Sequence, residues 1–179
     1  FRPVSGVAFF RWTFLLTSVA LVALGLWLLL ERRGWWPAES ELVRLLVPET
    51  RAEKLWAVLM LAPTAACCEE FLYRGYLQAQ LSEWLRSDAG SLAVTSVAFG
   101  LAHVYQGLGG MTRATVLGAL LAYPVLRLRT LYPSMGAHFL IDALALAWLG
   151  PAFLRQSSRP SREAAAKDGP GHGTDANVP

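Results

Sequence analysis

An uncharged stretch of 19 residues, Trp12 to Leu30, constrains this chain more than any other feature. Arg11 precedes it and Glu31 follows it. A helix needs about 20 apolar residues to cross a bilayer, whereas the core of a signal peptide has about 7–15. The composition agrees with a membrane protein, because only 16% of the residues are charged, against about 25% in soluble domains. The stretch therefore predicts a transmembrane helix.

Further apolar segments predict that the chain is an all-α, polytopic transmembrane bundle of about five spans. Small residues at 118 and 122 have a spacing that allows two helices to approach closely. The glycine-rich residues 106–113 lack the strand–turn–helix context of a phosphate loop, so a flexible connector is expected there. The four later segments are Leu55–Gln78, Leu92–Tyr105, Ala114–Leu126 and Leu131–Leu154.

The chain divides into three parts. Residues 1–54 hold the first span and an interfacial loop, in which residues 40–46 fit either a short helix capped by Ser40 or a plain charged loop. Residues 55–154 form a helical core, and residues 155–179 are a polar tail, rich in Pro, Gly and Ser, that we expect to be disordered. The net charge of +3 does not indicate nucleic acid, because the basic residues flank apolar segments and form no stripe. The expected surroundings are the lipid bilayer.

Six ionisable residues lie inside or beside the later apolar segments. An ionisable side chain at the centre of a membrane helix costs about 2.5–3.5 kcal/mol on insertion scales, and such residues usually face the bundle interior and serve a function. The alternative is a set of buried pairs that lock the helices together. We favour a functional role and expect the six ionisable residues to line an intramembrane cavity. The six are Glu69, Glu70, Arg74, His103, His138 and Asp142.

Helical spacing divides these residues into pairs. Glu70 and Arg74 are four residues apart, which favours an ion pair that neutralises both charges. Glu69 points about 100° away from Glu70 and is left without that cation. His138 and Asp142 are also one turn apart, and a carboxylate in that position can orient an imidazole. The spacing predicts a Glu70–Arg74 brace and a Glu69 that is free for chemistry.

A carboxylate and two imidazoles facing one cavity suit general acid–base hydrolysis. Glu69 would take a proton from water, His103 would help to orient that water, and His138 would stabilise the oxyanion. The alternative is a zinc site with the same three ligands, although the chain has no H-E-x-x-H motif. We expect no metal or other cofactor. Ser134 is the best alternative nucleophile, but there is no G-x-S-x-G motif around it.

These residues resemble the motifs of the CPBP glutamic-type intramembrane proteases, also called the CAAX protease, bacteriocin-processing or Abi family. That family carries E-E-x-x-x-R, F-x-x-x-H and H-x-x-x-N or H-x-x-x-D in this order. The chain has Glu69-Glu70-Phe-Leu-Tyr-Arg74, then Phe99-Gly-Leu-Ala-His103, then His138-Phe-Leu-Ile-Asp142, each on a separate apolar segment. The resemblance covers about residues 55–149.

The resemblance implies a function and roles for these residues. It implies an intramembrane peptidase that cuts a membrane-anchored or lipidated peptide, with Glu69 and His103 activating water, and His138 and Asp142 forming the oxyanion site. The core over 55–154 would then be the catalytic unit. At the position where the family has Asn or Asp, the chain has the acidic option, Asp142, whose ionised form cannot donate to an oxyanion as an Asn amide can. We expect His138 to be a neutral donor, because an apolar site disfavours an extra cation.

Three further expectations follow from the sequence, for the localisation, the rival function and the cysteines. The localisation expected is integral and multi-pass, in a bacterial cytoplasmic membrane. The rival function, from another class, is a catalytically silent membrane scaffold or a proton-coupled carrier that uses the same buried Glu and His residues. The two cysteines, Cys67 and Cys68, are sequence neighbours and predict neither an ordinary disulfide nor a zinc site.

Overall fold

The computed structural model describes residues 3–37 and 40–149, and all regular elements in these ranges are helices. This confirms the all-α fold class. The predicted polar tail, residues 155–179, lies outside the described residues. The α-helices are α1 (Gly6–Arg32), α2 (Glu41–Leu46), α3 (Arg51–Trp56), α4 (Ala62–Glu70), α5 (Gln78–Leu85), α6 (Asp88–Ala102), α7 (Gly107–Leu128) and α8 (Tyr132–Leu144). The remaining elements are three π-helical segments, η1 (Ala57–Leu61), η2 (Phe71–Leu77) and η4 (Ala145–Leu149), and one 3₁₀ turn, η3 (Val104–Gln106).

The elements from α3 to α5 form one uninterrupted helix of 35 residues, Arg51–Leu85. It begins with a capping box, in which Thr50 accepts from the backbone of Glu53 and the Glu53 side chain accepts from the backbone of Thr50. It ends at Arg86, whose left-handed φ of 48° turns the chain into α6. The π-helical segment η2 therefore interrupts the regular hydrogen bonding within a longer helix, as π-bulges at functional sites often do.

Among the described residues, two helices are long and apolar enough to cross a membrane, namely Gly6–Arg32 and Arg51–Leu85. A shorter apolar helix, α6, has 15 residues. Each of the five predicted apolar segments falls on a helix of its own as far as residue 149, the last being α8 with η4. The count of five spans stays a prediction, because only these two helices meet the requirement for length and hydropathy.

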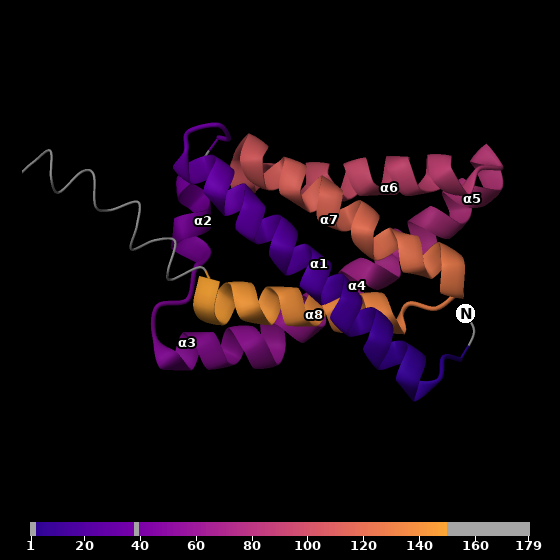
Figure 1. The fold of residues 1–179 in the computed structure, drawn as a ribbon, viewed down its shortest axis with the longest axis horizontal. Helices are drawn as coiled ribbons and strands as arrows, with labels where there is room; N and C mark the ends of the chain where they lie inside the picture. The colour runs from indigo at the N-terminus through magenta and orange to yellow at the C-terminus, as the bar shows by residue number, and fades with distance from the viewer. Residues whose placement is uncertain (1–2, 38–39, 150–179) are drawn as a thin grey trace, which may run out of the picture.

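In the view of Figure 1, α3, α6 and α8 run along the long axis of the molecule, whereas α1 and α7 lie oblique to it. α6 and α7 lie side by side, and α1 crosses α8 and also contacts α7. α8 packs against α4 on its other side, so that the predicted catalytic segments meet in the interior. At the crossing of α1 and α8, the Thr13 hydroxyl donates to the carbonyl of Pro133 at 3.4 Å. Leu16, Leu121 and Ala137 form the apolar core beneath that crossing.

The two helices α6 and α7 approach closely because glycines face the contact. A Cβ placed on Gly100 would lie 1.9 Å from the Thr115 hydroxyl oxygen and 2.8 Å from the carbonyl oxygen of Met111. A Cβ on Gly118 would lie 3.3 Å from the Phe99 ring. The close packing expected from the small residues at 118 and 122 is therefore confirmed, and Ala122 is fully buried.

The prediction of a flexible connector over 106–113 was wrong. Residues 107–113 are the first two turns of α7, and the turn is made instead by η3. The glycines serve close approach, since a Cβ on Gly109 would lie 2.4 Å from the carbonyl oxygen of Pro37. The backbone N–H of Ser40 donates to the carbonyl of Gln106 at 3.1 Å, which ties the preceding loop to this turn.

Ser40 does precede a short helix, α2, the first of the two alternatives, but its side chain makes no capping hydrogen bond. Its hydroxyl donates instead to the carbonyl of Tyr105. The side-chain cap of that alternative was therefore wrong, because a tertiary acceptor competes for the same hydroxyl.

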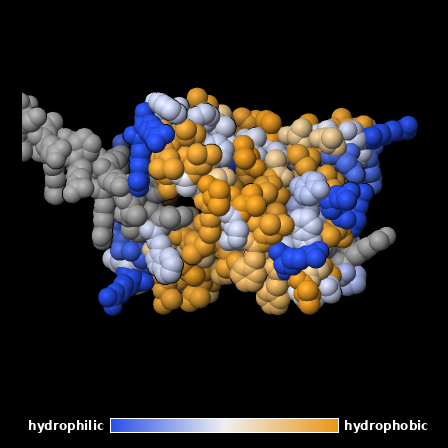
Figure 2. Space-filling view, viewed as in Figure 1, coloured by the Kyte–Doolittle hydropathy of each residue, from blue (hydrophilic) through white to orange (hydrophobic). Residues whose placement is uncertain are grey.

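Hydrophobic residues cover the middle of the molecule, while hydrophilic residues gather toward the two ends of its long axis (Figure 2). Many large apolar side chains are exposed, among them Leu26, Leu59, Val94 and Val116. Soluble monomers rarely expose contiguous apolar patches of more than a few hundred Å². The surface is therefore suited to a lipid environment.

Candidate active site

The predicted brace between Glu70 and Arg74 is present and lies in the interior. Arg74 Nη1 is 3.1 Å from Glu70 Oε1, and the exposed fractions of the two side chains are 1% and 0%. Arg74 Nη2 donates to the carbonyl of Gly118 at 3.0 Å, across to α7. The ion pair thus holds α4 and η2 against α7. A buried guanidinium without such partners would be very unfavourable.

His138 lies at the centre of the acidic residues. Its Nδ1 is 2.9 Å from Glu70 Oε1, and its Nε2 is 3.4 Å from Asp142 Oδ2 and 3.8 Å from Glu69 Oε2. The structure therefore places three of the six predicted site residues around the ring of a fourth, His138, and Arg74 is linked to that ring through its ion pair with Glu70. Sequence spacing had paired Glu70 with Arg74 alone and did not predict its bond to α8.

The partner that orients His138 differs from the one expected. Glu70, paired with Arg74, is a carboxylate and can only accept, so His138 Nδ1 carries the proton of their hydrogen bond. Asp142 contacts the other nitrogen, Nε2, at 3.4 Å. If the ring were neutral, Nε2 would have no proton to donate to an oxyanion. The expectation of a neutral His138 donor therefore conflicts with this geometry, which suits an imidazolium donor or a neutral base.

Glu69 differs from Glu70 in exposure as well as in partners. Its side chain is 32% exposed, and that of Asp142 is 31% exposed, whereas Glu70 is completely buried. Both partly exposed carboxylates flank His138 Nε2. Glu69 makes no ion pair with Arg74 in the described part of the chain. This is the separation of the adjacent glutamates that helical spacing predicted.

His103 ends α6, and its ring is oriented by its own helix. Its Nδ1 donates to the carbonyl of Phe99 at 2.8 Å, because a carbonyl oxygen can only accept. This hydrogen bond leaves Nε2 of the neutral ring with a lone pair that can accept a proton from water. Within residues 3–37 and 40–149, however, no hydrogen bond or ion pair joins His103 to Glu69.

Phe99 has an organising role that the sequence analysis did not assign. Its ring is 3% exposed and lies 4.7 Å from the ring of His103 and 6.1 Å from that of His138. The Arg74 guanidinium carbon lies 4.3 Å from the same ring centroid, within the range of a cation–π interaction. The spacing F-x-x-x-H was the available signal, but it could show only the contact with His103.

The alternative nucleophile is not placed for catalysis. Ser134 is fully buried, and its hydroxyl donates to the carbonyl of Leu121 at 2.8 Å, which joins α8 to α7. Its proton is therefore engaged in a structural hydrogen bond and not directed at an imidazole.

The described residues contain no group of three or more His, Cys, Asp or Glu side chains that could hold a metal ion. The alternative ligands Glu69, His103 and His138 thus do not form a preorganised zinc site in this structure. Cys67 and Cys68 are free, as their adjacency predicted, and both are exposed.

Comparison with protein families matches residues 51–144, slightly more than half of the chain, to a family model. The matching family is described as type II CAAX prenyl endopeptidase Rce1-like. The chain belongs to this family. The recognition of a CAAX protease from the three motifs is thereby confirmed, and all six predicted site residues lie within the matched range. No curated protein and no solved structure matches the chain.

Family membership assigns the chain to the CAAX prenyl endopeptidases, which are integral membrane hydrolases that act on membrane-anchored, prenylated substrates. It agrees with the apolar belt and with the two helices that are long enough to span a bilayer. The roles of individual residues are not part of that assignment.

Proposed function

We propose that the chain is a glutamic-type intramembrane endopeptidase that hydrolyses a peptide bond near the lipidated end of a membrane-anchored substrate. The observation that carries this proposal is the cluster around His138, where Glu70 engages Nδ1 while Glu69 and Asp142 flank Nε2. Three carboxylates around one imidazole are costly inside an apolar bundle. A purely structural pair would need only one of them.

In the proposed reaction, Glu69 accepts a proton from water as the water oxygen attacks the scissile carbonyl carbon. The proton then passes from Glu69 to the leaving amine as the carbon–nitrogen bond breaks, which regenerates the carboxylate. His103, with its Nε2 lone pair available, orients the water. His138, held by Glu70 and charged when Asp142 and Glu69 stabilise it, donates Nε2–H to the developing oxyanion.

The proposed setting is a five-span bundle in a bacterial cytoplasmic membrane. The spans would be α1, the long helix Arg51–Leu85, α6, α7 and α8 with η4. The apolar belt between two hydrophilic ends supports this assignment (Figure 2). The partial exposure of Glu69 and Asp142 supports access of a peptide to that side of the cluster.

The decisive experiment uses the purified chain in liposomes with a prenylated peptide that carries a C-terminal reporter. The wild type should release the reporter, and Glu69→Gln should lower turnover by about 10²–10⁴-fold, the range of a general base. Glu83→Gln, at an exposed position on the same continuous helix, is the matched control and should retain full activity. Absence of cleavage by the wild type would favour the scaffold or proton carrier instead.

A further inference from the structure

A stripe of polar side chains continues from the site along the long helix. We define the polar stripe as Glu70, Arg74, Gln78 and Ser82, which recur at every fourth residue. The first three are 0%, 2% and 1% exposed. Ser82 lies near the end of the helix, where its hydroxyl donates to Asp88. The stripe thus leads from the buried Glu70–His138 hydrogen bond to the exposed turn between α5 and α6.

The polar stripe is short of hydrogen-bond partners. Six buried side-chain atoms among the described residues lack a hydrogen bond, and four of them are on this stripe. They are Glu70 Oε2, Arg74 Nη1, and both the amide oxygen and the amide nitrogen of Gln78. Arg74 Nη1 still has its ion pair with Glu70 Oε1 at 3.1 Å, so the atoms left without any partner are Glu70 Oε2 and the two of the Gln78 amide. Leaving a buried polar group unsatisfied costs about 1–3 kcal/mol, so these three atoms require a partner that the described residues do not provide.

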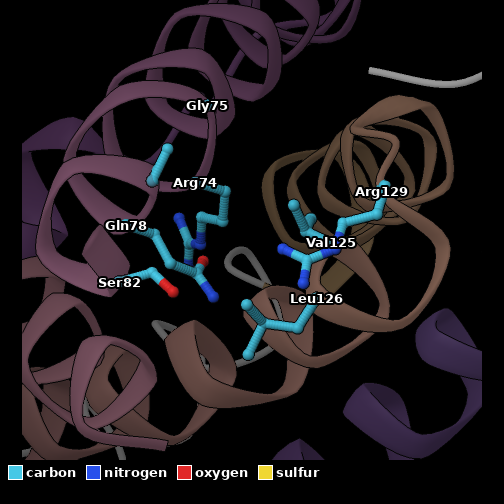
Figure 3. Close-up of a pocket in the computed structure, with 8 residues that line it drawn as sticks. Arg74, Gly75, Gln78, Ser82, Val125, Leu126 and Arg129 are labelled. Atoms are coloured by element: carbon cyan, nitrogen blue, oxygen red, sulfur yellow. The ribbon is translucent and has the colours of Figure 1, made fainter. Parts of the chain in front are cut away.

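A cavity of about 300 Å³ borders three of the four residues of the polar stripe, Arg74, Gln78 and Ser82. Arg74, Gln78 and Ser82 line one side, and Val125, Leu126 and Arg129 from α7 and its end line the other (Figure 3). Arg129, whose side chain is 59% exposed, lies at the outer end and pairs with Asp88 at 3.5 Å. The cavity therefore extends between a charged surface and the buried guanidinium of Arg74.

The chemistry of the unsatisfied atoms discriminates between occupants. An anion could accept from the amide nitrogen of Gln78 but would leave its amide oxygen unsatisfied. Arg74 is already paired with Glu70, so the buried end offers no unneutralised cation. Water can donate and accept, and each molecule needs about 30 Å³ and 2–4 polar partners, which this cavity can supply.

We propose that the cavity is a hydrated channel, which water enters at the Ser82–Arg129 end and follows along the polar stripe to Arg74 and Glu70. Gln78 is the positioning residue midway, because its amide can accept from one water and donate to the next. The use of this water in hydrolysis rests on the proposed function, whereas the hydration of the channel does not.

Cysteine accessibility tests the hydration directly, in a variant in which both native cysteines, Cys67 and Cys68, are replaced by Ala. Leu126→Cys places a thiol in the channel wall, and Tyr123→Cys places one on the 50% exposed outer face of the same helix. A charged, water-soluble methanethiosulfonate reacts with thiolates, which need water to form. Leu126→Cys should therefore react at least about tenfold faster than Tyr123→Cys, whose thiol faces the lipid. Adding Gln78→Leu should slow that reaction to the rate of the control.

Two outcomes would overturn the proposal. One is equal labelling of Leu126→Cys and Tyr123→Cys in membranes, which means that the channel is dry. The other is protection of Leu126→Cys by inorganic phosphate, which means that an anion occupies it. Should Leu126→Cys fail to fold, hydroxyl-radical footprinting of the unsubstituted protein replaces it. Oxidation of Leu126 should then exceed that of Leu72, which is 52% exposed on the outer surface.

Activity measurements separate this proposal from the proposed function. If the channel supplies the hydrolytic water, Gln78→Leu should lower kcat for the reporter peptide and leave KM unchanged. Fast labelling of Leu126→Cys together with an inactive wild type would reject the peptidase and retain the hydrated channel. An active wild type with a dry channel would reject the channel alone.

Discussion

Removing the charge of Glu70 tests the buried brace most directly. Glu70→Gln keeps the shape of the side chain and its ability to accept from His138, and it removes only the partner of Arg74. Both side chains of the pair are at most 1% exposed. Breaking a buried ion pair on one side costs about 3–5 kcal/mol, because the remaining charge stays buried. For a chain of this size, about 2–4 °C are lost per kcal/mol, so Tm should fall by roughly 6–20 °C.

Two matched variants make this expectation specific. Glu69→Gln changes the neighbouring residue in the same way, but its side chain is 32% exposed and its contact with His138 is longer, at 3.8 Å. Its effect on the free energy of unfolding should stay below about 1 kcal/mol, as for exposed ion pairs. In the double variant Glu70→Gln with Arg74→Met, no buried charge is left unpaired, so most of the lost stability should return.

The assay is thermal unfolding of the purified variants in one detergent, followed by the circular dichroism of the helices. Similar Tm values for Glu69→Gln and Glu70→Gln would refute the division between a free and a braced glutamate. A double variant no more stable than Glu70→Gln would show that the loss does not arise from the stranded charge of Arg74.

Three further predictions follow from the geometry. His138→Ala and Asp142→Leu should each lower turnover in the reporter assay by about 10²–10³-fold, the effect of losing one oxyanion donor. Asp142→Asn should be as inactive as Asp142→Leu, because an amide cannot stabilise an imidazolium. Near-wild-type turnover of Asp142→Asn would instead support a neutral His138 donor. Gly100→Ala should cost about 1–3 kcal/mol from overpacking against α7, whereas Gly25→Ala, which meets nothing within 4 Å, should be harmless in the same thermal assay. Active protein should contain well under one zinc per chain by elemental analysis, and slow chelation should not inactivate it. Stoichiometric zinc that is lost together with activity would instead support the zinc site.

Hydropathy and helical spacing, which depend only on nearby residues, predicted the helices and the first contacts within the site. The uncharged stretch 12–30 forces a long helix because backbone groups in lipid must bond within their own segment. The spacing of Glu70 and Arg74 gives their ion pair because residues four apart share a helix face. The family too was recognisable, since its motifs are short and ordered along the chain.

The same rules failed where a distant segment was the deciding partner. Glycines at 107, 109 and 110 have the composition of a flexible turn, yet they begin α7, where the loop before α2 packs against Gly107 and Gly109. The hydroxyl of Ser40 bonds to Tyr105 and not to its own helix for a related reason. A sequence shows which backbone conformations a residue allows but not which neighbour will occupy its space.

The geometry of the candidate site likewise belongs to the tertiary structure. By itself the sequence predicted which residues carry chemistry, and it separated Glu69 from Glu70 by their angle around the helix. Only the packing of α8 against α4 decided that Glu70, and not Asp142, bonds to His138 Nδ1. That contact joins residues 68 positions apart, and hydrogen bonds across helices depend on the rotation and translation of each helix. Those quantities are set by the side chains of the whole interface, so helical periodicity cannot supply them.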